Sequence, residues 1–161
     1  MEHPIAALSD RLELAPIVAA WLLDEFRHSA SPTLEVLTAK ISSRPVGQEE
    51  TFVLFDRDRP VGTASLTHKD LAARPDLTPW LSGVLVQPAF RGQGYASALV
   101  RRVEAFAQAA GVSTLWLYTW TAESLYLGLG WERIGLELDP NRGREVVLMR
   151  RSLTAPKEGA K

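Results

Sequence analysis

The chain has 161 residues, of which 46% are hydrophobic and 23% are charged, a composition typical of one globular domain with a sizeable core. Its 18 basic and 19 acidic residues give a formal net charge of -1, so no excess of positive charge is present to attract nucleic acid. The sequence contains no cysteine, which excludes a disulfide framework, a thiolate nucleophile and a cysteine-based metal site.

The sequence also argues against membrane and metal partners. Residues 1–5 lack the basic region and the apolar run of a signal peptide, and no apolar stretch reaches the roughly 18 residues that a membrane helix needs. We therefore expect a cytoplasmic protein with no membrane partner. The three histidines, His3, His28 and His68, lack the spacing of metal ligands, so no metal is expected.

Two helical patterns open the chain. Apolar side chains at three- and four-residue spacing predict a helix over 12–26, with Ser9 or Asp10 as its N-cap. A second helix is predicted over 32–41, with Ser31 as N-cap and a proline at the first helical position.

Two strand patterns follow, over 51–55 and 61–68. In the second strand, Gly, Ala and Leu alternate with Thr and Ser, which predicts an antiparallel pair with one buried face. A proline-containing loop over 72–79 then leads to a run of strand formers over 80–87.

The second half alternates between helix and strand patterns. These are a helix over 93–110 that ends at Gly111, a strand over 112–120, a short helix over 121–129, and two strands over 131–138 and 144–153. The order of elements predicts a mixed α+β sandwich, in which one sheet carries helices, as a single domain over 1–153. The polar tail over 154–161 is predicted to be flexible.

The junction between the strand at 80–87 and the next helix carries Arg91, Gly92 and Gly94. A glycine-bearing loop that opens a helix presents backbone N–H groups and the positive end of the helix dipole, which suits phosphate. Tyr95 and Ala96 stand where a nucleoside-triphosphate loop has Lys and Ser or Thr, so a diphosphate without magnesium is expected. The alternative is that the glycines only allow a tight turn.

Two motifs resemble those of the GNAT family of N-acetyltransferases. Arg91-Gly-Gln-Gly-Tyr-Ala96 is similar to the family's Arg/Gln-x-x-Gly-x-Gly/Ala pyrophosphate loop. Tyr126-Leu-Gly-Leu-Gly130-Trp131 is similar to its Tyr-x-x-x-Gly-Phe/Trp segment, at the expected distance after the loop. The resemblance implies the acyl-CoA N-acyltransferase fold, with a central, mostly antiparallel, splayed sheet and helices on both faces, as one N-acetyltransferase domain over 1–153.

The resemblance also implies acetyl-CoA as co-substrate, in a wedge between the strands at 80–86 and 112–120. Backbone groups on the first of these strands would contact the pantetheine arm, and those of the glycine loop would contact the pyrophosphate. The residues implied are Val84, Leu85, Val86, Arg91, Gly92, Gln93, Gly94, Tyr95 and Ala96.

The chemistry implied is direct attack of an amine on the thioester, with Tyr126 as proton donor to the departing sulfur. The alternative for Tyr126 is aromatic packing at the end of a short helix. Some family members carry His or Glu on the strand before the loop, but here no group on that strand titrates near neutrality, and Ser82 could only hold a water. The candidates for the base that deprotonates the amine are a water chain, Glu123, His68 and Asp70.

By family analogy, the acceptor would be selected by the segment 24–30 and the loop 69–79. Glu25 would attract a cationic amine or be an ordinary charge at a helix end. Trp80 and Trp120 would line the acceptor site or belong to the core. We expect a small primary amine as acceptor, such as a polyamine or an aminoglycoside. The alternatives are acetylation of a protein N-terminus or lysine, and a non-catalytic acyl-CoA sensor. A homodimer is compatible with the resemblance.

Overall fold

The computed structural model describes residues 4–45 and 48–153, so the tail predicted over 154–161 lies outside the described residues. Its sheet has seven strands in the order β1-β2-β3-β4-β5-β7-β6. The strands are β1 (Ile5–Ala7), β2 (Glu50–Asp56), β3 (Arg59–Thr67), β4 (Trp80–Val86), β5 (Thr114–Thr119), β6 (Glu132–Asp139) and β7 (Arg144–Ser152). The helices are α1 (Ala15–Phe26), α2 (Leu34–Ser42), α3 (Tyr95–Ala109) and α4 (Glu123–Gly128).

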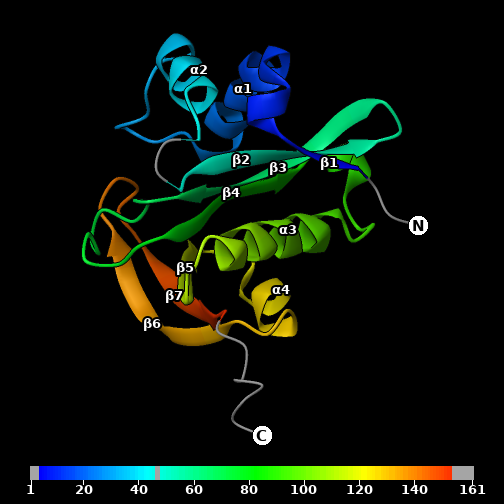
Figure 1. Cartoon of the computed structure of the whole chain (residues 1–161). Helices are drawn as coiled ribbons and strands as arrows, with labels where there is room; N and C mark the ends of the chain where they lie inside the picture. The colour runs from blue at the N-terminus through cyan, green and yellow to red at the C-terminus, as the bar shows by residue number, and fades with distance from the viewer. Residues whose placement is uncertain (1–3, 46–47, 154–161) are drawn as a thin grey trace, which may run out of the picture.

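The helices cover both faces of the sheet. Figure 1 shows α1 and α2 on one face and α3 and α4 on the other. The face under α3 carries the larger apolar cluster, which includes Leu99 and Val103, and the opposite face packs Val18 and Ile41 against β2. All described strand pairs are antiparallel except β4 with β5, which confirms the predicted mixed fold with a mostly antiparallel sheet.

The prediction of one buried face for the second strand is wrong. Every residue from Val61 to Thr67 is buried, because β3 lies at the middle of three layers with helices above and below it. The small and hydroxyl side chains are therefore packed rather than solvated. Thr63 Oγ1 donates to the carbonyl of Phe52 at 2.8 Å, and Ser65 bonds Thr51 at 3.0 Å.

The N-terminal caps of α1 and α2 differ from those predicted. The helix α1 begins after a 3-10 turn at Leu12–Leu14 and has no side-chain cap, and Ser9 bonds Glu50 instead. The helix α2 is capped by Thr33, whose Oγ1 accepts from the N–H of Val36 at 3.2 Å. The strand β1 went unpredicted because three residues are too few to show an alternating pattern.

The sheet opens between β4 and β5. These parallel strands pair only at Trp80 and Trp116, so the β5-facing edge of β4 has no ladder partner after its first residue. On the other side, β4 places Gly83 and Val84 opposite the single residue Ala64, a β-bulge in which Gly83 has a φ of +62°. Bulges bend a strand and re-aim its backbone groups. The C-terminal half of β4 is thereby separated from β5.

Among the described residues, none of the helices combines the length and the apolar character that a membrane span requires.

Candidate functional site

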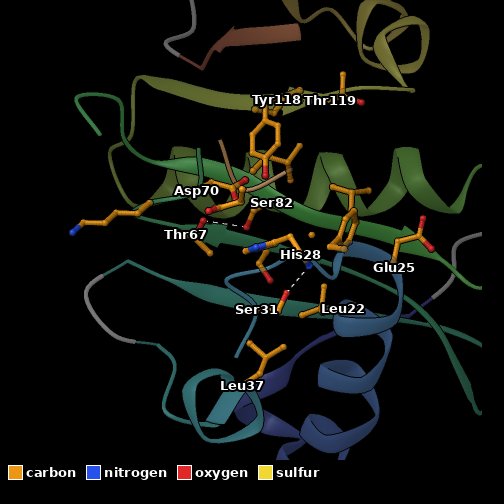
Figure 2. Close-up of a pocket in the computed structure, with 18 of the residues that line it drawn as sticks. Leu22, Glu25, His28, Ser31, Leu37, Thr67, Asp70, Ser82, Tyr118 and Thr119 are labelled. Atoms are coloured by element: carbon orange, nitrogen blue, oxygen red, sulfur yellow. Dashed lines mark hydrogen bonds between the residues drawn. The ribbon is translucent and has the colours of Figure 1, made fainter. Parts of the chain in front are cut away.

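A cavity of about 690 Å³ passes through the sheet at the opening between β4 and β5. Its walls come from helices on both faces, since Leu22 and Leu37 belong to α1 and α2 whereas Tyr126 belongs to α4. Gly83 and Val84 of the β4 bulge line it between these two ends. Its volume lies within the range of small-molecule sites, and Figure 2 shows the polar side chains that gather in it.

The glycine loop precedes α3 and is exposed. Gly92 has a φ of +78° and Gly94 a φ of +82°, a backbone region that other residues rarely adopt. A Cβ at either position would meet no atom within 4 Å, so the space over the loop is open. The first helical bond joins the N–H of Ala98 to the carbonyl of Gly94, and the first turn of α3 therefore directs its N–H groups toward the loop.

Arg91 is held at the end of β4. Its Nε donates to the carbonyl of Val86 at 2.9 Å, and its Nη2 lies 3.8 Å from Glu25. Glu25, which was predicted to attract a cationic acceptor, lines the cavity on the side nearest the glycine loop. Figure 2 shows it on the opposite side of the cavity from Asp70.

The other residues predicted to contact acetyl-CoA lie on β4, in the glycine loop and in the first turn of α3. Val84 lines the cavity, while the side chains of Leu85 and Val86 are buried and leave their backbones on the strand edge that faces β5. Tyr95 is buried at the start of α3, where its hydroxyl donates to Asp56 at 2.8 Å. Gln93 is exposed in the loop, and Ala96 is half-buried in the first turn of α3. Of these residues, only Val84 lines the cavity, and the others follow it along the chain to the first turn of α3.

Tyr126 reaches the cavity from α4. It is 7% exposed and packs edge-on against Trp131, with ring centroids 6.1 Å apart. Its hydroxyl makes no hydrogen bond to any residue that the structure describes, and burial raises its pKa to about 12. The hydroxyl is therefore protonated at neutral pH and free to donate into the cavity.

The two tryptophans have different environments. Trp80 is wholly buried, donates from Nε1 to the carbonyl of Leu77 at 2.8 Å, and does not line the cavity. Trp120 lines the cavity and meets Phe26 edge-on at 6.4 Å. Of the pair, the structure places only Trp120 at the site.

The polar residues considered as bases differ in whether they line the cavity. Ser82 bonds the hydroxyl of Thr67 at 3.1 Å, and both side chains line the cavity, as the dashed line in Figure 2 shows. His68 and Asp70 follow β3 in the chain and also line the cavity. Glu123 lies outside the lining and pairs with Arg133 at 3.5 Å.

Arg142 was not predicted as a site residue, although it joins three elements. It donates to Asp139 at 2.7 Å, to the carbonyl of Phe26 at 2.5 Å and to the hydroxyl of Tyr118 at 3.4 Å. The turn between β6 and β7 is thereby tied to the end of α1. Only turn-forming residues were visible at 139–143, and no local pattern reports a contact with residue 26.

No group of three or more His, Asp or Glu side chains within the described ranges could hold a metal ion. Within the described residues, the site therefore combines an exposed glycine loop, an unpaired strand edge and a cavity lined by Tyr118 and Tyr126, whose raised pKa values keep both hydroxyls protonated at neutral pH.

Comparison with known proteins agrees with this arrangement. No curated protein sequence matches the chain. A phosphinothricin acetyltransferase from Sinorhizobium meliloti, solved with acetyl-CoA, superposes with a TM-score of 0.72 at 20% identity, over 99% of this chain and 95% of that one. An aminoglycoside 6'-N-acetyltransferase from Enterococcus faecium gives 0.75 at 12% identity, over 96% and 99%. The ribosomal-protein-S18-alanine N-acetyltransferase from Escherichia coli gives 0.65 at 20% identity, over 98% and 97%.

These likenesses establish the fold, and the acceptors named for the three proteins differ, so the fold does not select among acceptors. The sequence pattern described as the Acetyltransferase (GNAT) family matches residues 16–130, which is more than half of the chain. The match covers the glycine loop and the second motif up to Gly130, and the chain therefore belongs to the GNAT family of acetyltransferases.

Proposed function

We propose that this protein transfers the acetyl group of acetyl-CoA to the primary amine of a small molecule by direct attack. The observation that carries the proposal is the cavity that crosses the sheet between β4 and β5. A donor bound on the α3 side and an acceptor bound on the α1 side would meet there. A binding site closed at the sheet would not bring two substrates together.

The donor would lie along the unpaired edge of β4 with its pyrophosphate on the glycine loop. The open space over Gly92 and Gly94 fits a phosphate, because no side chain occupies it and the N–H groups of α3 point toward it. The thioester would then reach the β4 bulge, where backbone groups bind its carbonyl oxygen. The same donor is bound by the Sinorhizobium meliloti protein with this fold.

A small acceptor is favoured by the closure of the α1 side. Arg142 ties the β6–β7 turn to the carbonyl of Phe26, and the Oγ of Ser29 donates to the carbonyl of Asn141 at 3.3 Å. These two bonds bridge the cavity wall at the place where a protein acceptor would need an open groove. Aromatic walls from Phe26 and Trp120 suit a compact organic body.

In the reaction, the amine nitrogen forms a bond to the thioester carbonyl carbon and the carbon–sulfur bond breaks. Tyr126 gives its proton to the departing thiolate, since its raised pKa keeps the hydroxyl protonated at neutral pH. The phenolate then recovers a proton from the newly bonded nitrogen. No covalent enzyme intermediate is needed.

Release of the CoA thiol from acetyl-CoA, measured with and without spermidine, kanamycin or glycine, tests the proposal. We expect at least one amine to accelerate thiol release and to yield an N-acetylated product by mass spectrometry. Acetyl-CoA binding without acceleration by small amines, but with acetylation of a peptide N-terminus or lysine, would contradict the small-molecule acceptor. Binding with no acceptor of either kind would identify a sensor. Cytoplasmic location and a homodimer stay predictions.

A further inference from the structure

Three carboxyl groups line the cavity, from Glu25, Glu49 and Asp70. Glu25 pairs with Arg91, and Glu49 lies 3.7 Å from the guanidinium of Arg44 and accepts a backbone N–H. Asp70 has neither an ion-pair partner nor a hydrogen bond among the residues that the structure describes. It is therefore the one cavity carboxyl within the described ranges whose charge is not already matched.

Asp70 is held in place by its neighbours. The next residue, Leu71, is 3% exposed and packs with Trp80 in the apolar cluster beneath the loop. Thr78 Oγ1 donates to the carbonyl of His68 at 2.7 Å and closes the loop between β3 and β4. Figure 2 draws Asp70 next to Tyr118 and Ser82, which line the same cavity. The loop is thus held in a position that places Asp70 at the side of the cavity proposed for the acceptor.

The surroundings of the Asp70 carboxyl group favour its protonated form. Asp70 is exposed on its loop, but the atoms near its carboxyl group desolvate the charged form and raise its pKa to about 7. Arg142 and Lys40 act in the opposite direction, and the nearby charge of Asp139 adds to the rise. Tyr118, on the facing strand, has a pKa raised to about 12, chiefly by burial and then by Asp70.

The remaining charged or titratable neighbours lie on two segments. His68 and Lys69 precede Asp70 on its own loop and line the cavity. His28 follows α1, and its pKa is lowered by burial and then by Arg142. An uncharged His28 does not compete with a cationic acceptor.

We propose that Asp70 binds the ammonium group of the acceptor and takes its proton before attack on the thioester. This inference rests on the proposed acetyl transfer to an amine and names the base that β4 lacks. The carboxylate gains a partner for its unmatched charge, and the amine is delivered to the cavity beside the β4 bulge.

The proton balance is complete without another reagent. The R–NH₃⁺ acceptor gives one proton to the Asp70 carboxylate, and the nitrogen lone pair of R–NH₂ forms the bond to the acetyl carbon. The carbon–sulfur bond breaks and the thiolate takes a proton from Tyr126. The second nitrogen proton restores the Tyr126 hydroxyl, and Asp70 releases its proton to solvent.

The pH dependence has a defined sign. A base must be unprotonated, so kcat/KM should rise as the pH passes upward through about 7 and then level off. Below that pH, protonated Asp70 neither attracts the ammonium nor accepts its proton. In the variant Asp70→Asn this inflection should be lost.

The test measures thiol release from acetyl-CoA between pH 5.5 and 9, a range chosen to bracket a pKa of about 7, with the most active amine of the panel. The variants are Asp70→Asn, Asp70→Glu and, as matched control, Asp76→Asn. Asp76 lies on the same loop, outside the cavity lining, and pairs with Arg74 at 2.9 Å. We expect Asp70→Asn to lower kcat/KM at pH 7 by about 100-fold, the lower range for a general base.

Asp70→Glu should keep the pH inflection, because it keeps a carboxyl group, and Asp76→Asn should match the wild type. Unchanged acetyl-CoA binding in Asp70→Asn would exclude misfolding as the cause. If the wild type turns over an amine and Asp70→Asn shows the same pH profile, Asp70 is not the base and the proposed function stands. If the wild type turns over no amine, the proposed function and this inference both fail.

Discussion

At the scale of single residues, Tyr126 connects packing with chemistry. Its ring is fixed against Trp131, and its hydroxyl makes no bond to a described residue. The hydroxyl opens onto the cavity and is not among the buried polar atoms of the described residues that are left without a partner. A hydrogen bond from it to the departing thiolate of CoA would form only when the reaction occurs, which is the condition for an interaction that raises kcat.

Replacement of Tyr126 by Phe keeps the ring packing and removes the proton donor. We expect kcat to fall by about 100-fold, the lower range for general acid catalysis, since a thiolate is a fair leaving group even without help. Steady-state kinetics and calorimetry check the prediction, and the affinity for acetyl-CoA should not change. Equal turnover in wild type and variant would show that the tyrosine only packs.

The sequence predicts those candidate site residues that belong to local motifs. The glycines of the loop and Tyr126 could be found because each stands at a fixed place relative to a strand and a helix. Asp70 was one option among several, since nothing in the sequence separates a cavity carboxyl from a solvated one. Arg142 stayed hidden because its partners come from α1 and β5, far away along the chain.

At the scale of elements, the β6–β7 turn forms a wall of the cavity on the side proposed for the acceptor. Arg142 lies over the ring of Trp120 at 4.8 Å and pairs with Asp139, which is 2% exposed. A buried ion pair is costly to break from one side, because the remaining charge has lost its partner. The turn is therefore held against α1 by a contact whose loss affects stability and acceptor binding together.

The variant Arg142→Met should lower the free energy of unfolding by about 3 kcal/mol, because Asp139 is left buried without its ion-pair partner. It should also raise the KM for the acceptor more than the KM for acetyl-CoA. Urea denaturation and kinetics measure both effects.

Arg144→Met is the matched control. Arg144 also lies over the ring of Trp120, at 5.4 Å, but it is exposed and pairs with no carboxylate among the described residues. We expect its free energy of unfolding to change by no more than about 0.5 kcal/mol. The same loss of stability in both variants would contradict the assigned role of the Arg142–Asp139 pair.

Most elements were predictable because their patterns are local. The helix α3 shows a regular apolar stripe, and Gly111 ends it with a φ of +87°. The cap of α2 is Thr33 rather than Ser31, because neighbouring hydroxyl residues can cap equally well and tertiary packing decides between them. The helix α1 has no side-chain cap, since Ser9 bonds Glu50 instead. The strand β1 could not be predicted from its own three residues, because only its pairing with β2 identifies it as a strand.

At the scale of the whole molecule, the proposed function depends on an opening in the sheet. The bulge at Gly83 and the single pairing of Trp80 with Trp116 separate β4 from β5 and let a cavity cross the layers. Neither feature is visible in the sequence as such, since both depend on pairing with other strands. The splayed sheet was expected only through the resemblance to a family.

The central claim, that this opening and the glycine loop bind acetyl-CoA, is tested most directly by calorimetry of acetyl-CoA binding. The wild type should bind with a dissociation constant of about 1 μM, equivalent to about -8 kcal/mol. Gly94→Glu should abolish binding, because it puts bulk and negative charge in the open space over the loop.

Gly111→Glu, at the other end of α3, has a similarly positive φ and equally open surroundings, so it carries the same strain without reaching the loop. It should bind acetyl-CoA like the wild type. No binding to the folded wild type, or equal loss in the two glycine variants, would contradict the account.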